Sequence, residues 1–249
     1  MTENRFDDEK SADTAARIRC FDENYALVKE RIIAAAERAG RAGGDVRLLA
    51  ATKTVPVEVI NHAIASGIDL IGENRVQELL GKLDRLDKSA ERHHIGRLQT
   101  NKVRAVVGKV SMIESVDSLH LAEEISKRSA ALGITTDILV EVNIGDEESK
   151  SGIPAADAQE FAEKLAPFEA IKVRGLMSIP PICETKAEIC RYFDKMYKLF
   201  IDISCKKIDN INMDFLSMGM SGDFEEAIAS GANIVRLGSV LFGQRVYNK

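Results

Sequence analysis

The sequence contains no tryptophan, and only 5 % of its 249 residues are aromatic. It has four cysteines, which form no CxxC pair and show no zinc-ligand spacing, so we expect reduced, buried thiols. These residues are Cys20, Cys183, Cys190 and Cys205. Because the four histidines are also scattered along the chain, the sequence predicts no metal site.

The chain also lacks a basic excess, a secretory signal and a long apolar run. A net charge of −5 and a pI near 5.6 disfavour a basic face for nucleic acid. The first ten residues are charged and contain no apolar core, and no stretch is long enough to span a bilayer. We therefore expect a cytoplasmic protein that binds neither nucleic acid nor membranes.

Residues 1–12 are predicted to form a flexible N-terminus. A long amphipathic helix should follow over 14–41, because apolar residues such as Ile18, Phe21, Tyr25 and Val28 recur at helical spacing. Gly40 and the pair at 43–44 should end it.

After this helix, eight apolar runs alternate with seven helical patterns. The expected strands are 46–52, 69–72, 93–96, 110–116, 136–143, 171–179, 213–218 and 234–237. The expected helices are 56–66, 75–87, 99–108, 118–132, 155–166, 185–206 and 223–230. This alternation favours a parallel sheet covered on both faces, and its size favours a (β/α)₈ TIM barrel with an extra N-terminal helix. A doubly wound open sheet is the alternative, but the turn after the first strand lacks the GxGxxG pattern. We predict one α/β domain over 13–249.

Lys53 lies where the first buried strand ends. A lysine in this place needs a partner, a shifted pKa or a covalent bond. Taken alone, it is equally compatible with an ion-paired lysine whose amine reaches solvent.

The segments after the last two expected strands have the composition of a phosphate site. In a TIM barrel this site is commonly formed by the loops after strands 7 and 8. Gly219, Gly222 and Gly238 allow backbone amides to approach an anion, and serine hydroxyls add donors. These serines are Ser217, Ser221 and Ser239. Ordinary turn chemistry is the competing explanation.

Arg236 lies inside the last apolar strand, where an unpaired arginine is costly. It would form a structural salt bridge or donate to a ligand. Together, the lysine, the phosphate loops and this arginine fit pyridoxal phosphate, which carries an aldehyde, a phosphate and a pyridine nitrogen.

Seven segments in order along the chain now identify a resemblance. They are LAATKT (49–54), GENRVQE (72–78), HHIGRLQTNK (93–102), VNIGDEESKSGI (142–153), RGLMSIP (174–180), LSMGMSGD (216–223) and VRLGSVLFG (235–243). With these segments the chain closely resembles the pyridoxal-phosphate homeostasis protein family, single-domain relatives of the N-terminal barrel of alanine racemase.

The resemblance implies a pyridoxal 5'-phosphate-binding protein that holds the cofactor as an aldimine on Lys53. It implies that Arg236 faces the pyridine nitrogen and that Asn74 and Met177 border the cofactor. The implied phosphate contacts are Ser221, Gly238, Ser239 and, with less support, Ser217. Thr52, Arg75 and His94 depart from the residues usual in the family.

The resemblance implies cofactor handling without strong catalytic turnover, with apo pyridoxal-phosphate enzymes as candidate recipients and a monomeric state. An arginine at the pyridine nitrogen leaves it unprotonated and weakens the ring as an electron sink. No tyrosine offers a second acid/base group for racemisation, since three are expected on outer helices and Tyr247 in the tail. The alternatives are a small amino-acid racemase and a class I aldolase, in which the lysine binds a sugar phosphate.

Overall fold

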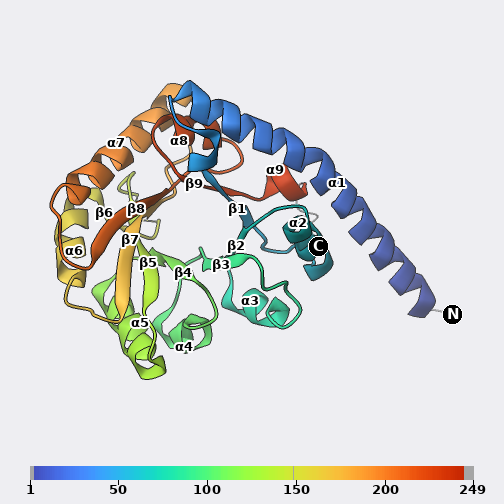
Figure 1. The fold of residues 1–249 in the computed structure, drawn as a ribbon, viewed down its shortest axis with the longest axis horizontal. Coiled ribbons are helices and arrows are strands. Elements are labelled where there is room, and N and C mark those ends of the chain that lie inside the picture. The colour runs from blue at the N-terminus through green and yellow to red at the C-terminus, as the bar shows by residue number, and fades with distance from the viewer. Residues whose placement is uncertain (1–2, 148, 244–249) are drawn as a thin grey trace.

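The computed structural model describes residues 3–147 and 149–243, with side chains from residue 13 onward. Its helices and strands alternate around a barrel (Figure 1). The strands are β1 Arg47–Ala51, β2 Leu70–Glu73, β3 Glu91–His94, β4 Met112–Val116, β5 Thr136–Asn143, β6 Ile153–Pro154, β7 Ile171–Ser178, β8 Ile211–Ser217 and β9 Ile234–Leu237. The α-helices are α1 Glu3–Arg38, α2 Val57–Ala65, α3 Val76–Lys82, α4 Val103–Val106, α5 Leu119–Leu132, α6 Ala158–Leu165, α7 Lys186–Ser204, α8 Phe224–Ala229 and α9 Ser239–Phe242. Three 3₁₀ turns, at Gly43–Asp45, Thr100–Lys102 and Ala155–Asp157, complete the list.

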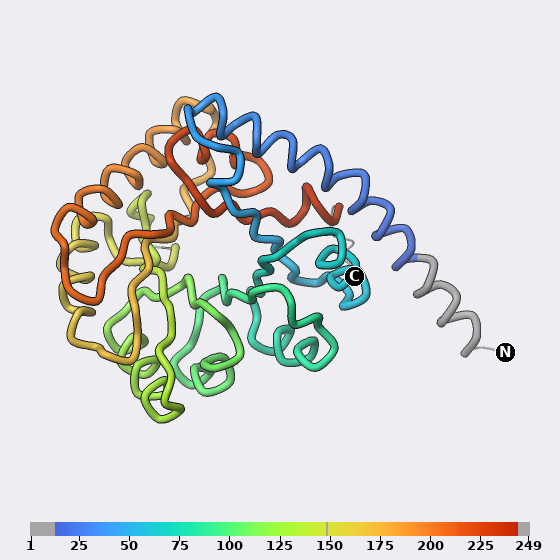
Figure 2. Tube along the Cα trace, in the orientation of Figure 1, coloured from blue at the N-terminus to red at the C-terminus, as the bar shows by residue number. Residues whose placement is uncertain are grey.

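Eight parallel strands close into the barrel. Their order is β4-β3-β2-β1-β9-β8-β7-β5, and pairing of β4 with β5 closes the ring. The trace in Figure 2 follows this circuit, with the first and last strands side by side. The predicted fold class, a (β/α)₈ barrel with an extra N-terminal helix, is confirmed. Because all eight strands run in parallel, the segments after them open at one mouth.

Several strands are buried on both faces because the barrel interior covers one face and the helices cover the other. Every residue of β4 and β9 is buried, and so is every residue of β2. The expected bounds of 136–143 and 234–237 match β5 and β9. In such a barrel, polar side chains can reach a ligand from the carboxyl ends of the strands or from the barrel interior.

The N-terminal helix differs in its bounds from the expected helix at 14–41. It begins at Glu3, within the segment predicted to be flexible, and ends at Arg38. Residues 3–38 contain neither glycine nor proline, and acidic residues near the start favour the positive end of the helix dipole. A helix can therefore begin in a segment that shows no periodic apolar face.

Helix α1 braces the short helix α9 at the mouth. The Phe21 ring stacks on Phe242 with centroids 5.5 Å apart, and Asn24 Nδ2 donates to Leu241 O at 3.2 Å. Phe21 is fully buried. The extra N-terminal helix thus supports one of the two predicted phosphate loops.

Other differences are local. Helix α3 ends at Lys82, short of the expected residue 87, because the Asn61 side chain binds the backbone of Arg85 and Asp87 in the following turns. The two-residue strand β6 was not expected and pairs with β5 through Ile153 and Val142. Among the described helices, none has the length and apolar character needed to cross a membrane.

Candidate cofactor site

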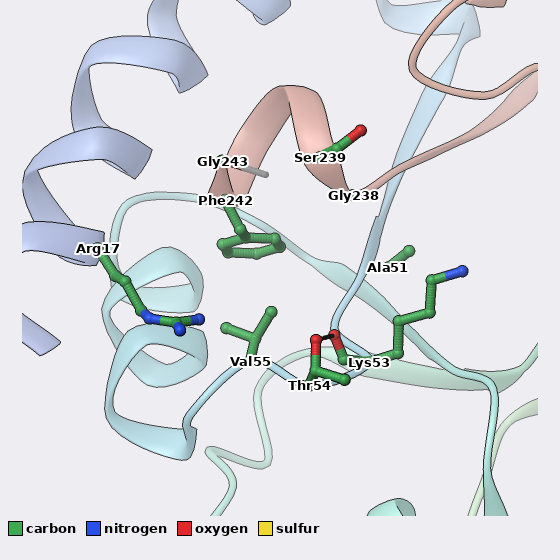
Figure 3. Close-up of a pocket in the computed structure, with 9 residues that line it drawn as sticks. All are labelled: Arg17, Ala51, Lys53, Thr54, Val55, Gly238, Ser239, Phe242 and Gly243. Atoms are coloured by element: carbon green, nitrogen blue, oxygen red, sulfur yellow. Dashed lines mark hydrogen bonds between the residues drawn. The ribbon is translucent and has the colours of Figure 1, made fainter. Parts of the chain in front are cut away.

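Lys53 lies at the mouth of the barrel, two residues beyond the end of β1. It lines a pocket together with Gly238 and Ser239 from the end of β9 (Figure 3). The pairing of Ala50 with Leu237 places the two strand ends side by side. In Figure 3 the Lys53 amine and the Ser239 hydroxyl extend to the same side of the pocket, away from Arg17 of α1. The half-buried amine therefore shares its surroundings with the predicted phosphate loop.

The loops after β8 and β9 are joined through Ser221. Its hydroxyl oxygen accepts from the backbone amides of Gly238 and Val240 at 3.4 and 3.3 Å. Gly219 turns the first loop with a φ of +93°, and a Cβ there would come within 2.6 Å of the Ala227 side chain. A Cβ at Gly222 would meet nothing within 4 Å. The two loops form a compact, glycine-lined cup whose amides converge on one oxygen, the geometry that an anion requires.

Arg236 begins a polar chain that crosses the barrel interior. Its guanidinium donates to Ser217 Oγ at 2.8 Å and to the Ser178 carbonyl at 2.9 Å. Ser217 Oγ in turn donates to Glu114 Oε2 at 2.6 Å, and His93 Nδ1 lies 2.6 Å from Glu114 Oε1. These side chains come from β9, β8, β4 and β3, and all four are buried. Ser217 therefore belongs to this series of hydrogen-bonded side chains, below the cup.

The charges of this chain balance one another. Burial opposes ionisation of Glu114, but the hydrogen bond and charge of His93, the Arg236 charge and the Ser217 hydroxyl together lower its pKa. Burial would lower the pKa of His93, yet its contacts with Glu114 and Glu91 raise it. Among the described residues no carboxylate pairs directly with Arg236, so Glu114 balances its charge through Ser217. Of the two alternatives expected for Arg236, a direct salt bridge is therefore not formed among the described residues, and the arginine is linked to Glu114 through Ser217.

A second carboxyl, Glu141, lies near the carboxyl end of β5. Burial and the nearby Asp117 charge raise its pKa to about 7, while Arg236 and Arg97 oppose this. Its side chain makes no hydrogen bond to another described residue, although it is only 7 % exposed. Glu141 therefore places a group that titrates near neutral pH within electrostatic reach of Arg236.

Asn74 and Met177 complete the predicted set. Asn74 Oδ1 is buried without a hydrogen-bond partner among the described residues. A Cβ at Gly96 would lie 2.1 Å from the Asn74 carbonyl, so the ends of β2 and β3 touch. Met177 pairs in register with Ser217 and packs in an apolar layer inside the barrel. The predicted set thus includes one buried amide oxygen without a partner and one side chain of an apolar layer.

The chain matches known proteins along most of its length. The family described as "Alanine racemase, N-terminal domain" matches residues 8–246. A protein of Aquifex aeolicus named "Pyridoxal phosphate homeostasis protein" is 46 % identical over 226 residues, 90 % of this chain and 98 % of that protein. The protein of that name from Escherichia coli is 37 % identical over 230 residues, 91 % of this chain and 97 % of its own. The chain belongs to the pyridoxal phosphate homeostasis protein family.

Solved structures agree with this assignment. PipY of Synechococcus elongatus, solved with PLP bound, has 32 % identity and a TM-score of 0.75, covering 87 % of this chain and all of its own. A protein of Bifidobacterium adolescentis described as unknown has 42 % identity and a TM-score of 0.86, covering 91 % and 96 %. Alanine racemase of Clostridium difficile, at 15 % identity and a TM-score of 0.72, shares the fold.

The departures from the usual residues of the pyridoxal phosphate homeostasis family differ in their surroundings. Arg75 is largely exposed and lies 3.9 Å from Glu78. His94 is fully buried, and burial lowers its pKa to about 4, so it is neutral at physiological pH. Thr52 is buried and donates from Oγ1 to Glu73 at 2.7 Å.

Three polar residues of the barrel interior escaped the sequence prediction: His93, Glu114 and Glu141. Glu114 and Glu141 each interrupt an apolar strand, the same signal that singled out Arg236. A search for any charged residue inside an apolar strand, carboxylates included, would therefore have found Glu114 and Glu141. No sequence pattern pairs His93 with Glu114, because their contact arises only when β3 and β4 lie side by side.

Proposed function

We propose that this protein binds pyridoxal 5'-phosphate as a Schiff base on Lys53 and serves in pyridoxal-phosphate homeostasis. The observation that carries the proposal is the shared pocket of Lys53, Gly238 and Ser239, beside an anion cup closed by Ser221. The names of the relatives and the PLP-bound structure of PipY support the choice of cofactor.

The residues present fit the cofactor. In the cup, a Cβ at Gly222 would meet nothing within 4 Å, and one at Gly238 would lie 3.4 Å from the Ala51 carbonyl oxygen. Asn74 offers a buried acceptor that lacks a partner among the described residues. Pyridoxal phosphate supplies an aldehyde that a neutral lysine attacks, with a phosphate that the cup would hold. Arg236 would face the pyridine nitrogen and, because a guanidinium does not give up its proton, would leave that nitrogen unprotonated.

The cofactor proposal is tested by the visible absorption spectrum of the purified protein. Wild type should be yellow, and borohydride reduction should fix one pyridoxyl group on Lys53, as read by peptide mass mapping. Lys53→Ala should abolish the adduct. Lys88→Met, which removes an exposed lysine elsewhere on the chain, is the control and should keep it. A colourless wild type that gains no reducible adduct from added pyridoxal phosphate would sink the proposal.

We further propose that the protein handles the cofactor without strong catalytic turnover. Three tyrosines lie on helices outside the barrel: Tyr25 on α1, where it stacks on Phe21, and Tyr192 and Tyr197 on α7. Tyr247 lies outside the described residues. These positions support the absence of a tyrosine acid/base among the described residues. The homeostasis names of the relatives support a role without strong turnover.

One observation favours the second candidate, a small amino-acid racemase. Glu141 titrates near neutral pH at the same end of the barrel and could serve as a second acid/base group. Incubation with each L-amino acid in deuterated water separates the two functions. The homeostasis proposal expects no multiple-turnover exchange of the α-proton, and fast exchange that Glu141→Gln abolishes would establish the racemase instead.

The cellular setting is also a proposal. We infer that the protein acts in the cytoplasm as a monomer and passes cofactor to apo forms of pyridoxal-phosphate enzymes. The described cysteines are free thiols, as in reducing compartments. Sedimentation of the cofactor-loaded protein tests the monomeric state. Direct hand-over is tested by comparing transfer of labelled cofactor to an apo-transaminase in one mixture with transfer across a dialysis membrane.

A further inference from the structure

The residues on either side of Lys53 are held by one ion-pair cluster. The Thr52 carbonyl accepts from Lys82 Nζ at 2.8 Å, and the Thr54 amide donates to Glu78 Oε2 at 2.8 Å. Each bond reaches the backbone and involves a charged side chain, which makes it stronger than a neutral one. The peptide units before and after Lys53 are therefore both tied to α3, through Lys82 and Glu78.

Glu73 joins these two side chains into a cluster. Lys82 Nζ lies 2.7 Å from Glu73 Oε1 and 3.7 Å from Glu78 Oε2. Glu73 Oε1 also accepts from Thr52 Oγ1. The side chains of Glu73 and Lys82 are only 2 and 13 % exposed, so solvent screens their attraction little. The cluster therefore links Glu73 of β2 to Glu78 and Lys82 of α3.

The backbone that this cluster holds is strained. Thr54 has a φ of +62°, a left-handed conformation that β-branched residues rarely adopt. Such a conformation persists only where the surroundings impose it, and the bond from Glu78 to the Thr54 amide is such a restraint. Thr54 Oγ1 also donates to the Lys53 carbonyl at 2.6 Å, which tightens the same turn.

We propose that Glu73, Glu78 and Lys82 are positioning residues that hold the backbone of Lys53 so that its amine points into the cofactor pocket. This inference rests on the proposed function, because it assigns the cluster a purpose only if Lys53 is the cofactor lysine. The cluster acts through the backbone carbonyl before Lys53 and the backbone amide after it.

The test compares Lys82→Met and Glu78→Gln with wild type, with Lys82→Arg as the conservative variant and Lys88→Met as the charge-matched control. Two quantities are measured. One is hydrogen exchange of the segment 52–55 in the cofactor-free protein. The other is the rate at which added pyridoxal phosphate gives a borohydride-reducible adduct on Lys53, followed by quenching and mass spectrometry.

Lys82→Met should speed exchange of the segment and slow adduct formation by about tenfold, the effect of losing one hydrogen bond to a charged group. Glu78→Gln, which keeps the size of the side chain, should act in the same direction. Lys82→Arg should recover part of both, and Lys88→Met should match wild type. A cluster that merely stabilised the fold would lower the melting temperature without changing the rate in the folded protein.

The outcomes separate this inference from the proposed function. A wild type that forms no adduct on Lys53 refutes the cofactor proposal and, with it, the purpose of the cluster. A wild type that forms the adduct while Lys82→Met and Glu78→Gln form it equally fast refutes the positioning role alone. If Lys82→Met does not fold, Glu78→Gln decides between these results.

Discussion

Replacing Glu141 by glutamine should make the stability of the protein depend less on pH. Glu141 lies in β5, is 7 % exposed, and has a pKa raised from 4.5 to about 7 by burial and by the charge of Asp117. Glutamine has nearly the same size but no charge to bury. The substitution therefore removes the titration while leaving the packing of the strand in place.

The sign of the effect follows from proton binding. Because the folded-state pKa of Glu141 exceeds its unfolded value, the folded protein binds more protons between the two values. Its contribution to the free energy of unfolding is thus fully present below pH 4.5 and is lost as pH rises to 7. One pKa unit corresponds to about 1.36 kcal/mol, so the loss amounts to about 3 kcal/mol above neutral pH.

Urea unfolding of the cofactor-free proteins at several pH values measures this difference. Glu141→Gln should gain stability over wild type by up to about 3 kcal/mol between about pH 5 and pH 8. Asp117→Asn in the wild-type background should move the transition to lower pH, because it removes the charge that raises the pKa of Glu141. A difference between Glu141→Gln and wild type that stays constant over this range would refute the reasoning.

Three further substitutions test the packing around the site. Glu114→Gln should lower the free energy of unfolding by about 3–5 kcal/mol in urea, because it removes the largest of the negative charges that offset the burial of Arg236; a neutral outcome would mean that Glu141 and Asp223 balance the arginine. Gly219→Ala should lower the free energy of unfolding by about 1–3 kcal/mol, since φ is +93° and the new Cβ would lie 2.6 Å from the Ala227 Cβ; an unchanged melting temperature would contradict this. Phe21→Ala should lower the free energy of unfolding by about 3–5 kcal/mol, because α9 loses its stacking partner. It should also weaken pyridoxal phosphate binding, as measured by titration calorimetry; unchanged affinity would show that α9 does not depend on Phe21.

The alternation of apolar runs and helical patterns predicted the barrel because most strands are largely buried on both faces and the helices between them pack through one face. Element ends were less well predicted. Helix α3 stops at Lys82 because Asn61 captures the turns that follow, a contact between segments more than twenty residues apart in sequence. The early start of α1 at Glu3 depends on helix propensity without an apolar face, which hydrophobic periodicity does not detect.

The sequence brought Lys53, Gly238 and Ser239 to one pocket because the first and last strands of a barrel are neighbours. Ser217 received less support than Ser221 as a phosphate contact, but the glycine-rich segment did not assign it another role. Ser217 is the last residue of β8 and points to Glu114, whereas Ser221 lies four residues on, in the loop. Strand alternation determines whether a serine faces the barrel interior, but it applies only to residues within the strand. The end of β8 must therefore be known before Ser217 can be assigned.

The backbone around Lys53 and the arginine of the barrel interior are held by two separate polar networks. Thr52 and Glu73 bond to Lys82 of α3, in the cluster behind the lysine. Arg236, Ser217 and Glu114 form the chain of side chains that crosses the barrel interior. Among the described residues the two networks share no side chain. The cluster on α3 can therefore hold the backbone of Lys53 while the interior network orients Arg236.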